Sequence, residues 1–273
     1  MEKGTVRRLQ IEESIFRQQG ANTSLNHVTR VLFCGPHFPD SQNFTKEYLK
    51  DYPMVQIDDI PFENVSAMIG DYDICVVKNF EMNSDVISRA KNMKLIMQFG
   101  VGLDGVDINA ATKQGIKVAK IPSGETGNAA SFAEMVDERG SHDDILKFAS
   151  KADIVVSCLP MTTETIGIVN NDFISAMKKG ALLINIGRGG VLDYEAVYNN
   201  LKLGHLGGLG IDVVWTEPFD PLNPILQLPN VIITPHVAGV TQSSFRYMAK
   251  VVGDVALQLH AGKMSYIGIE IVN

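Results

Sequence analysis

Cysteine and long apolar runs are both scarce in this sequence of 273 residues. The three cysteines, Cys34, Cys75 and Cys158, each lie in or beside a short apolar run, and no two share a spacing that metal ligands use. We therefore expect buried free thiols in a reducing compartment and no metal site. No apolar run reaches the ~20 residues that span a bilayer, so the sequence predicts no membrane protein.

Positive charge is in short supply as well. The 24 Lys and Arg residues are outnumbered by 31 Asp and Glu residues, which gives a net charge of -7 at pH 7. The densest basic group, from Lys3 to Arg8, is followed closely by Glu12 and Glu13. Because a surface of this sign repels phosphate backbones, we expect no nucleic-acid partner.

The first 28 residues are polar and lack the apolar core of a secretory signal. We interpret residues 1–28 as a loose N-terminal extension. Acids such as Glu12 have the wrong sign for an organellar transit peptide, so we expect a cytoplasmic location, with an organelle as the open alternative.

Short apolar runs alternate with segments of helical periodicity along the rest of the chain. The predicted strands are 29–34, 73–77, 94–98, 116–119, 153–158, 181–186, 207–214 and 231–234. The predicted helices are 41–51, 84–92, 127–136, 143–150, 171–178, 193–202 and 241–261. This alternation predicts an α/β protein built from βαβ units, with parallel sheets that helices cover on both faces.

Two local patterns mark particular helices. The last helix carries one apolar stripe at three- and four-residue steps, formed by Phe245, Met248, Val252, Val255 and Leu259. Further back, an apolar helix that begins at Ser131 is cut short by the charged run 137–140, which is either a loop boundary or a junction. Ser141, with Asp144 three positions on, predicts the N-cap of a new helix.

Three segments in the C-terminal half follow predicted strands and carry Arg188, Glu217 and His236. In open α/β sheets, ligands bind at the carboxyl ends of the strands. There, an arginine could clamp an anion, a carboxylate could orient a neighbour, and a histidine could act as a general acid or base. For any one of them alone, the favoured interpretation is structural: a surface ion-pair residue, a turn acid or an ordinary loop histidine.

Together, the Arg-Gly, Glu-Pro and Pro-His-x-Ala-Gly motifs, in this order, resemble the D-isomer-specific 2-hydroxyacid dehydrogenases. That family includes glyoxylate/hydroxypyruvate reductases, phosphoglycerate dehydrogenases and formate dehydrogenases, and the resemblance runs from about residue 29 to the C-terminus. It implies that Arg188 binds the carboxylate of a small 2-hydroxy or 2-oxo acid, that His236 moves the hydroxyl proton, and that Glu217 orients His236. It also implies NAD or NADP as cofactor and allows a homodimer.

The loop that begins Gly100, Val101, Gly102 matches the G-x-G-x-x-G dinucleotide pattern. The resemblance gives it another role, as a substrate-domain loop whose backbone N–H groups hold the substrate carboxylate. Lys78, after the predicted strand 73–77, matches a basic substrate contact of the family, and a solvated lysine is the alternative.

On the cofactor side, the resemblance assigns seven residues. They are Cys158, Pro160, Thr165, Ile186, Gly187, Asp212 and Gly239. The family's own glycine-rich unit should lie between Met135 and Asp153, where such a unit needs ~30 or more residues. Here only 17 residues separate the two, with Gly140 as the one glycine. The sequence therefore resembles a family member with an internal deletion, and NAD(P) binding is expected to be weak or absent.

The resemblance implies two flavodoxin- or Rossmann-like parallel-sheet domains. We expect a substrate domain of 29–128 plus 240–273 and a reduced nucleotide-binding domain of 129–239. Two functions stay open, a working NAD(P)-dependent dehydrogenase and a non-catalytic truncated isoform or subunit. The deletion also predicts that strand 153–158 becomes a sheet edge without protecting charges, which favours self-association.

Overall fold

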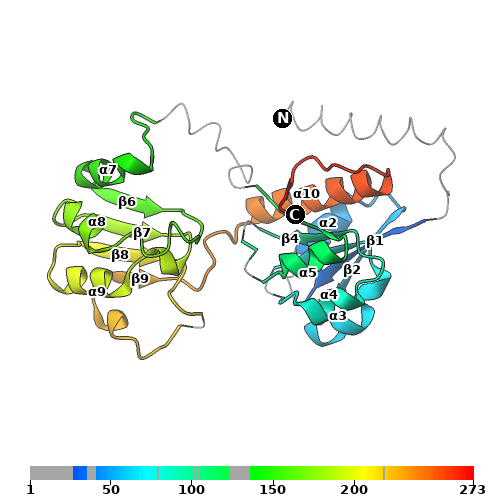
Figure 1. Cartoon of the computed structure of the whole chain (residues 1–273), viewed down its shortest axis with the longest axis horizontal. Coiled ribbons are helices and arrows are strands. Elements are labelled where there is room, and N and C mark those ends of the chain that lie inside the picture. Colours follow the sequence, from blue (N-terminus) through cyan, green and yellow to red (C-terminus); the bar gives the residue numbers. More distant parts are fainter. Residues whose placement is uncertain are drawn as a thin grey trace. The chain divides into compact units, whose positions relative to one another are not determined.

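The computed structural model describes residues 27–35, 41–78, 80–100, 102–103, 105–122, 136–217 and 219–273. The chain divides into two compact units, Met1–Glu134 with Gln242–Asn273, and Met135–Thr241 (Figure 1). The sequence placed its domain boundaries nearby, at 128/129 and 239/240. Nearly all of the expected N-terminal extension and of the expected helix 127–136 lies outside the described residues.

The first unit is built on a six-stranded sheet of order β10-β5-β4-β3-β1-β2, in which β10 alone is antiparallel. Its strands are β1 (Thr29–Cys34), β2 (Val55–Ile60), β3 (Ile74–Val77), β4 (Leu95–Gln98), β5 (Lys117–Lys120) and β10 (Glu270–Ile271). Its helices are α2 (Ser41–Tyr48), α3 (Phe62–Met68), η1 (Ile69–Asp71), α4 (Ser84–Arg89), α5 (Ile108–Lys113) and α10 (Gln242–His260).

Helices cover both faces of this sheet. Val65 of α3, Ile87 of α4 and Ala111 of α5 belong to one buried cluster with alternate strand residues. On the other face, the ring of Phe245 in α10 packs on Phe99, with centroids 5.4 Å apart. The chain direction across the sheet reverses between β1 and β3, so right-handed crossovers place helices on both sides.

Helix α10 belongs to the first unit although it follows the second along the chain. All five residues of its predicted apolar stripe are buried. Tyr48 Oη donates to Asp254 Oδ1 at 2.5 Å, and Thr29 Oγ1 lies 3.1 Å from His260 Nδ1. Helix α10 therefore packs on the first sheet, as expected, and the role of this unit as a substrate domain stays a prediction.

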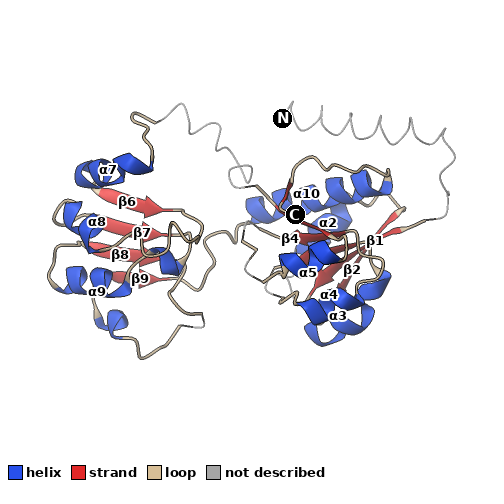
Figure 2. Cartoon of the chain, in the orientation of Figure 1, coloured by secondary structure: helices blue, strands red, loops and turns tan. Residues whose placement is uncertain are grey.

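The second unit is a four-stranded parallel sheet of order β6-β7-β8-β9 (Figure 2). Its strands are β6 (Ile154–Ser157), β7 (Leu182–Asn185), β8 (Gly208–Ile211) and β9 (Val231–Ile233). Its helices are η3 (His142–Asp144), α7 (Ile145–Lys151), α8 (Asn171–Ala176), η4 (Gly189–Val191), α9 (Tyr194–Lys202) and η5 (Pro224–Gln227). The predicted N-cap at Ser141 is confirmed, since Ser141 and Asp144 form a capping box.

The expectation that helices cover both faces of each sheet is wrong for this unit. Buried residues of α7, α8 and α9 form one core with Leu183 and Leu209, on one face. On the other face, large apolar side chains stay exposed among the described residues. They are Ile154 (56% exposed), Val156 (54%), Leu182 (39%) and Ile232 (71%).

Strand order explains this one-sided cover. The four strands follow one another across the sheet in sequence order, and each crossover is right-handed by the general rule for parallel strands. Helices of successive crossovers then lie on the same side, as α8 and α9 do in Figure 1. Cover on the second face requires strands beyond β6 that reverse the order, and no described strand lies there.

The prediction that the strand at 153–158 forms an edge is confirmed, because β6 pairs only with β7 in the described part of the chain. This corrects the expectation that all three cysteines are buried. Cys158 follows the edge strand and is exposed, whereas Cys34 and Cys75 are buried with their sulfur atoms 2.7 Å apart. Burial raises the pKa of the Cys75 thiol, which favours its protonated form.

The elements of the first unit that had not been predicted include β2, α3 and β10. The acids Asp58 and Asp59 interrupt the apolar pattern of β2, and Asp58 is paired with Arg30 of β1 at 3.2 Å. Main-chain pairing with β1 over six residues, with this ion pair beside it, gives a strand where the local pattern favours a loop. Strand β10 has only two residues, too short for any periodicity.

Candidate functional site

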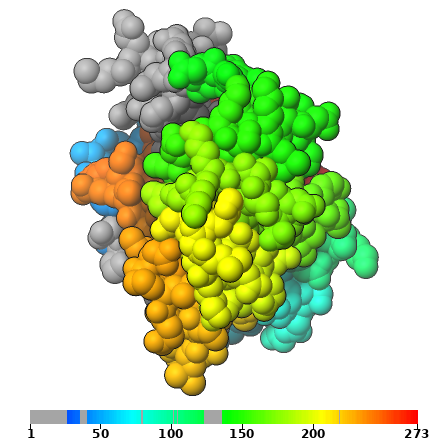
Figure 3. Space-filling model, turned by 90° about the vertical axis from the view of Figure 1, so that its left-hand side faces the viewer, coloured from blue at the N-terminus to red at the C-terminus, as the bar shows by residue number. Residues whose placement is uncertain are grey.

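Loops from all four strands of the second unit meet at the carboxyl edge of its sheet. A Cβ added to Gly187, after β7, would lie 2.4 Å from the carbonyl oxygen of Leu159, after β6. One added to Gly189 would lie 2.1 Å from that of Val214, after β8. These two glycines are therefore required by close backbone approach. Figure 3 shows the surface of this unit at the opposite end, where the strands begin.

Asn185 shapes the turn that carries Arg188. Its fully buried side chain accepts from Gly187 N at 3.1 Å and donates to the Arg188 carbonyl at 2.9 Å. The Arg188 guanidinium donates to the Gly187 carbonyl at 2.8 Å and is half-buried. Sequence reasoning did not single out Asn185, although a polar residue at the end of an apolar strand was the available signal.

Asp212 holds the loop after β9 against the end of β8. Its carboxylate accepts from Thr234 Oγ1 at 2.5 Å and from the amides of Val237 and Ala238 at 2.8 Å each. Burial on its own would raise the pKa of this carboxyl, but these hydrogen bonds outweigh burial and the pKa is lowered. Asp212 is thus an ionised clamp on the loop; its expected role beside a cofactor stays a prediction.

His236 and Glu217 form a pair at this edge. The shortest separation of His236 Nδ1 from a Glu217 carboxylate oxygen is 3.2 Å, so the predicted contact between them is confirmed. Both side chains are about half exposed, at 49% and 48%. The His236 amide donates to the Asp212 carbonyl at 2.9 Å, and its φ of 55° is a conformation that costs a non-glycine residue energy.

Trp215 fixes the loop that carries Glu217. Its indole N–H donates to the Leu192 carbonyl at 2.8 Å, and its ring packs edge-on against Tyr194 at 4.9 Å. The loop after β8 is therefore tied to the segment that follows Arg188. This positioning role was not foreseen, because it depends on a partner 23 residues away.

The remaining cofactor-side candidates lie on the same edge. Cys158 and Ile186 are exposed, at the ends of β6 and β7. Thr165 Oγ1 donates to the Pro160 carbonyl at 2.6 Å and closes the loop after β6. A Cβ at Gly239 would meet nothing within 4 Å. The structure thus brings these residues to neighbouring loops without giving them a ligand role.

The expected substrate contacts of the first unit lie at the carboxyl ends of β3 and β4. Lys78 directly follows β3, and its Nζ lies 5.1 Å from the centre of the Phe245 ring. Desolvation lowers the pKa of Lys78 to about 8. Gly100 and Gly102 follow β4, and Gly100 has a φ of 143°. Val101 lies outside the described residues.

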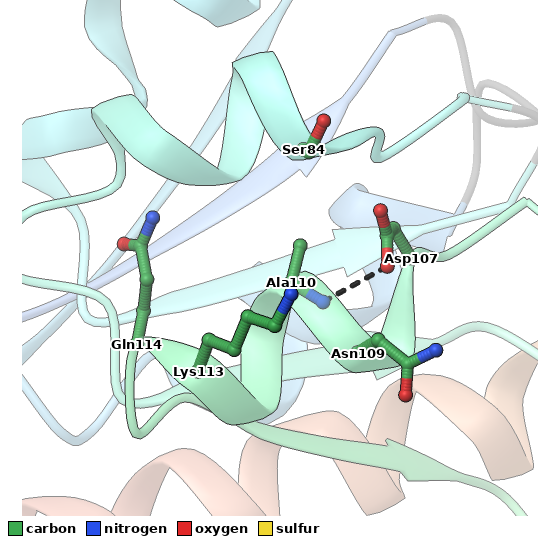
Figure 4. Close-up of a pocket in the computed structure, with 6 residues that line it drawn as sticks. All are labelled: Ser84, Asp107, Asn109, Ala110, Lys113 and Gln114. Atoms are coloured by element: carbon green, nitrogen blue, oxygen red, sulfur yellow. Dashed lines mark hydrogen bonds between the residues drawn. The ribbon is translucent and has the colours of Figure 1, made fainter.

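A polar pocket of about 480 Å³ lies elsewhere on the first unit, between α4 and α5 (Figure 4). Ser84, Asp107 and Lys113 are among its lining residues. The Asp107 carboxylate is already engaged, since it accepts from Ala110 N at 2.9 Å and caps α5. None of the predicted site residues lines this pocket, so the candidate site is elsewhere.

The described residues directly before β6, 136–153, lack the features that hold the pyrophosphate of a dinucleotide. In relatives of this fold, that group sits on a glycine-rich turn and a helix N-terminus. Here residues 136–153 contain a single glycine and form only η3 and α7. The start of α7 carries Asp143 and Asp144, whose negative charges oppose a phosphate.

No described helix has the length and apolarity to cross a membrane. No group of three or more His, Cys, Asp or Glu side chains in the described ranges is arranged to hold a metal ion.

Comparison with known proteins places the chain. A family model described as "D-isomer specific 2-hydroxyacid dehydrogenase, NAD binding domain" matches residues 100–238. The D-3-phosphoglycerate dehydrogenase of Archaeoglobus fulgidus is 26% identical over 272 aligned residues, which cover 73% of this chain and 52% of that protein. The glyoxylate reductase of Thermofilum pendens is 25% identical over 267, covering 70% and 78%. The chain thus spans about half the length of the first of these relatives.

Solved structures share the fold. The apo-structure of D-lactate dehydrogenase from Escherichia coli has a TM-score of 0.73 at 16% identity, and covers 89% of this chain and 99% of that one. The NADPH-dependent glyoxylate/hydroxypyruvate reductase of Sinorhizobium meliloti, in complex with NADP and malonate, has a TM-score of 0.68 at 21% identity, and covers 89% and 96%. At these identities the likeness shows the fold alone.

Proposed function

Because the chain belongs to the D-isomer-specific 2-hydroxyacid dehydrogenase family, we propose that it binds a small 2-hydroxy or 2-oxo acid at the carboxyl edge of its second sheet but has impaired hydride transfer. The observation that carries the proposal is the contact of His236 with Glu217 at 3.2 Å. A histidine held by a carboxylate suits proton transfer to and from a substrate oxygen.

The proposed roles of the residues follow from their positions. Glu217 faces Nδ1 of His236, which leaves Nε2 as the atom that exchanges a proton with the substrate oxygen. Arg188 follows the adjoining strand β7, and its planar guanidinium suits a carboxylate. Lys78 and the loop from Gly100 are the proposed substrate contacts of the first unit. Asp212 and Asn185 act as positioning residues.

We attribute the impaired hydride transfer to the lack of a binding site for the pyrophosphate of NAD or NADP. The cofactor would supply the hydride, and the residues before β6 do not offer a pyrophosphate site. The alignment to the A. fulgidus protein supports this, since it has 272 positions yet covers only 73% of 273 residues. The alignment therefore has more positions than the part of this chain that it includes. This is expected when this chain lacks a segment that the relative has.

A second candidate is a non-catalytic subunit on the same scaffold. The observation that favours it is the open edge at β6, where another chain could add strands that this one lacks. The two candidates differ in substrate binding. The first requires that this chain bind a 2-hydroxy or 2-oxo acid without a partner, and the second does not.

Fluorescence titration with NADH, together with calorimetric titration with oxalate as a stable analogue of a 2-oxo acid, tests the proposal. We expect no saturable NADH binding at micromolar concentrations and only background reduction of glyoxylate or hydroxypyruvate. Oxalate should bind to the wild-type chain, and Arg188→Ala should abolish this binding. Arg139→Ala is the control, because it removes a positive charge elsewhere in the same unit and should leave oxalate binding unchanged. Micromolar NADH affinity would refute the impairment, and absence of oxalate binding would favour the non-catalytic subunit.

A further inference from the structure

The outer edge of β6 presents unpaired main-chain groups. Toward β7, the Asp153 carbonyl accepts from Leu182 N at 2.9 Å and the Ser157 carbonyl from Ile186 N at 3.0 Å. Successive residues of a strand direct their N–H and C=O groups to opposite sides. The groups of Ile154 and Val156 therefore face away from β7, and no strand among the described residues pairs with them.

This edge lacks the features that usually prevent pairing. No charged residue occurs from Ile154 to Thr163, and Ile154 and Val156 are more than half exposed. An apolar groove of about 490 Å³ runs beside the strand, lined by Ile145, Phe148 and Ala149 of α7 and by β6 itself. An exposed apolar edge without lysine, proline or a bulge is a template for another strand.

We propose that β6 pairs antiparallel with β6 of a second copy of this chain, around a two-fold axis at Val155, to give one continuous eight-stranded sheet. The inference does not rest on the proposed function. A strand that pairs with itself around a two-fold axis needs no other complementary sequence. Only residues whose N–H and C=O groups face outward can pair across this edge. Ile154 therefore lies opposite Val156 of the second copy, and each residue of this pair donates one hydrogen bond to the other and accepts one.

Side chains on the helix-covered face support this register. Val155 meets Val155 of the second copy, and Asp153 lies opposite Ser157 of the second copy. Ser157 Oγ is buried and has no hydrogen-bond partner among the described residues. The opposing carboxylate of Asp153 gives it an acceptor. Since Asp153 is also paired with Lys178 at 2.8 Å, the contact brings no isolated charge to the interface.

The flanking helices are complementary in charge. Asp143 and Asp144 precede α7, whereas Lys147 and Lys151 lie within it and at its end. A two-fold axis at Val155 makes the two α7 helices antiparallel, so that the acidic start of one lies toward the basic end of the other. A second copy thus suits this edge in hydrogen bonding, apolar surface and charge.

Sedimentation velocity and light scattering on the full chain test the proposal. We expect a particle of twice the 29.9 kDa monomer mass. Val156→Pro removes an outward N–H and no bond to β7, and Ile154→Lys adds a charge, so each should weaken the dimer by about tenfold or more. Ile232→Lys, at the still more exposed centre of the opposite outer strand, is the control and should leave the dimer intact.

A disulfide tests the register. In a Cys158→Ser background, Val155→Cys should give a covalent dimer with oxidised glutathione, which takes up the two hydrogens of the thiols, while Ile232→Cys should not. Far-UV circular dichroism and Trp215 fluorescence check that each variant is folded. A wild-type chain that stays monomeric, or a dimer that survives both edge substitutions, would overturn the proposal. So would the absence of the Val155→Cys crosslink, or a monomer whose edge instead binds an added apolar peptide.

Discussion

Replacing Asp212 with alanine should destabilise the second unit and release the loop that holds His236. The carboxylate, whose residue is only 5% exposed, accepts hydrogen bonds from Thr234 Oγ1 and from the amides of Val237 and Ala238. The substitution removes all three acceptor contacts at once.

The expected magnitude follows from those three contacts. A hydrogen bond to a charged group contributes about 1.5–3 kcal/mol. The full sum overstates the loss, since Val237 is 38% exposed and water can reach the released amides. We therefore expect the free energy of unfolding of this unit to fall by about 2–4 kcal/mol.

Urea unfolding followed by tryptophan fluorescence measures this change. Trp215 is the single tryptophan of the chain and lies in the second unit, so its signal reports that unit selectively. With a slope of about 2 kcal/mol/M, the midpoint should fall by about 1–2 M. Asp137→Ala is the matched control, because Asp137 is an exposed acid of the same unit and surface substitutions change stability little. Equal midpoints for the two variants would refute the clamp role of Asp212.

The pH dependence supplies a second readout. The pKa of Asp212 is lowered in the folded chain, so its contribution to stability is complete above the ordinary value of 3.8 and is lost as the pH falls through the lowered folded value. The wild-type protein should therefore lose more stability on acidification than Asp212→Ala. Parallel acid profiles would contradict the assignment.

Two further predictions concern the proposed site. Gly187→Ala should destabilise the second unit by about 1–3 kcal/mol, since its Cβ would lie 2.4 Å from the Leu159 carbonyl oxygen. Gly239→Ala, which meets nothing within 4 Å, should be nearly neutral in the same urea titration, and equal effects would refute the close approach. The pKa of Lys78 is about 8, so its charge, and with it the affinity for oxalate, should decline as the pH rises above that value. Lys78→Gln should bind oxalate more weakly and without this decline in calorimetry, and an unchanged profile would exclude Lys78 as a substrate contact.

Local patterns in the sequence were sufficient for most elements. Runs of apolar residues located eight of the strands, and the stripe from Phe245 to Leu259 located the buried face of α10. The capping pair Ser141 and Asp144 was readable because both partners lie within one turn. The contact between Glu217 and His236 was predicted through motif resemblance, since spacing alone cannot bring two loops together.

Other features were decided only in the tertiary structure, because their partners are far apart in the sequence. Strand β2 pairs with β1 along all six of its residues, and there Asp58 meets Arg30, a partner 28 residues away. The buried side chain of Asn185 and the clamp at Asp212 depend on loops that meet at one sheet edge. The exposed face of the second sheet follows from strand order, which sets the side on which right-handed crossovers place their helices, and which no local periodicity contains.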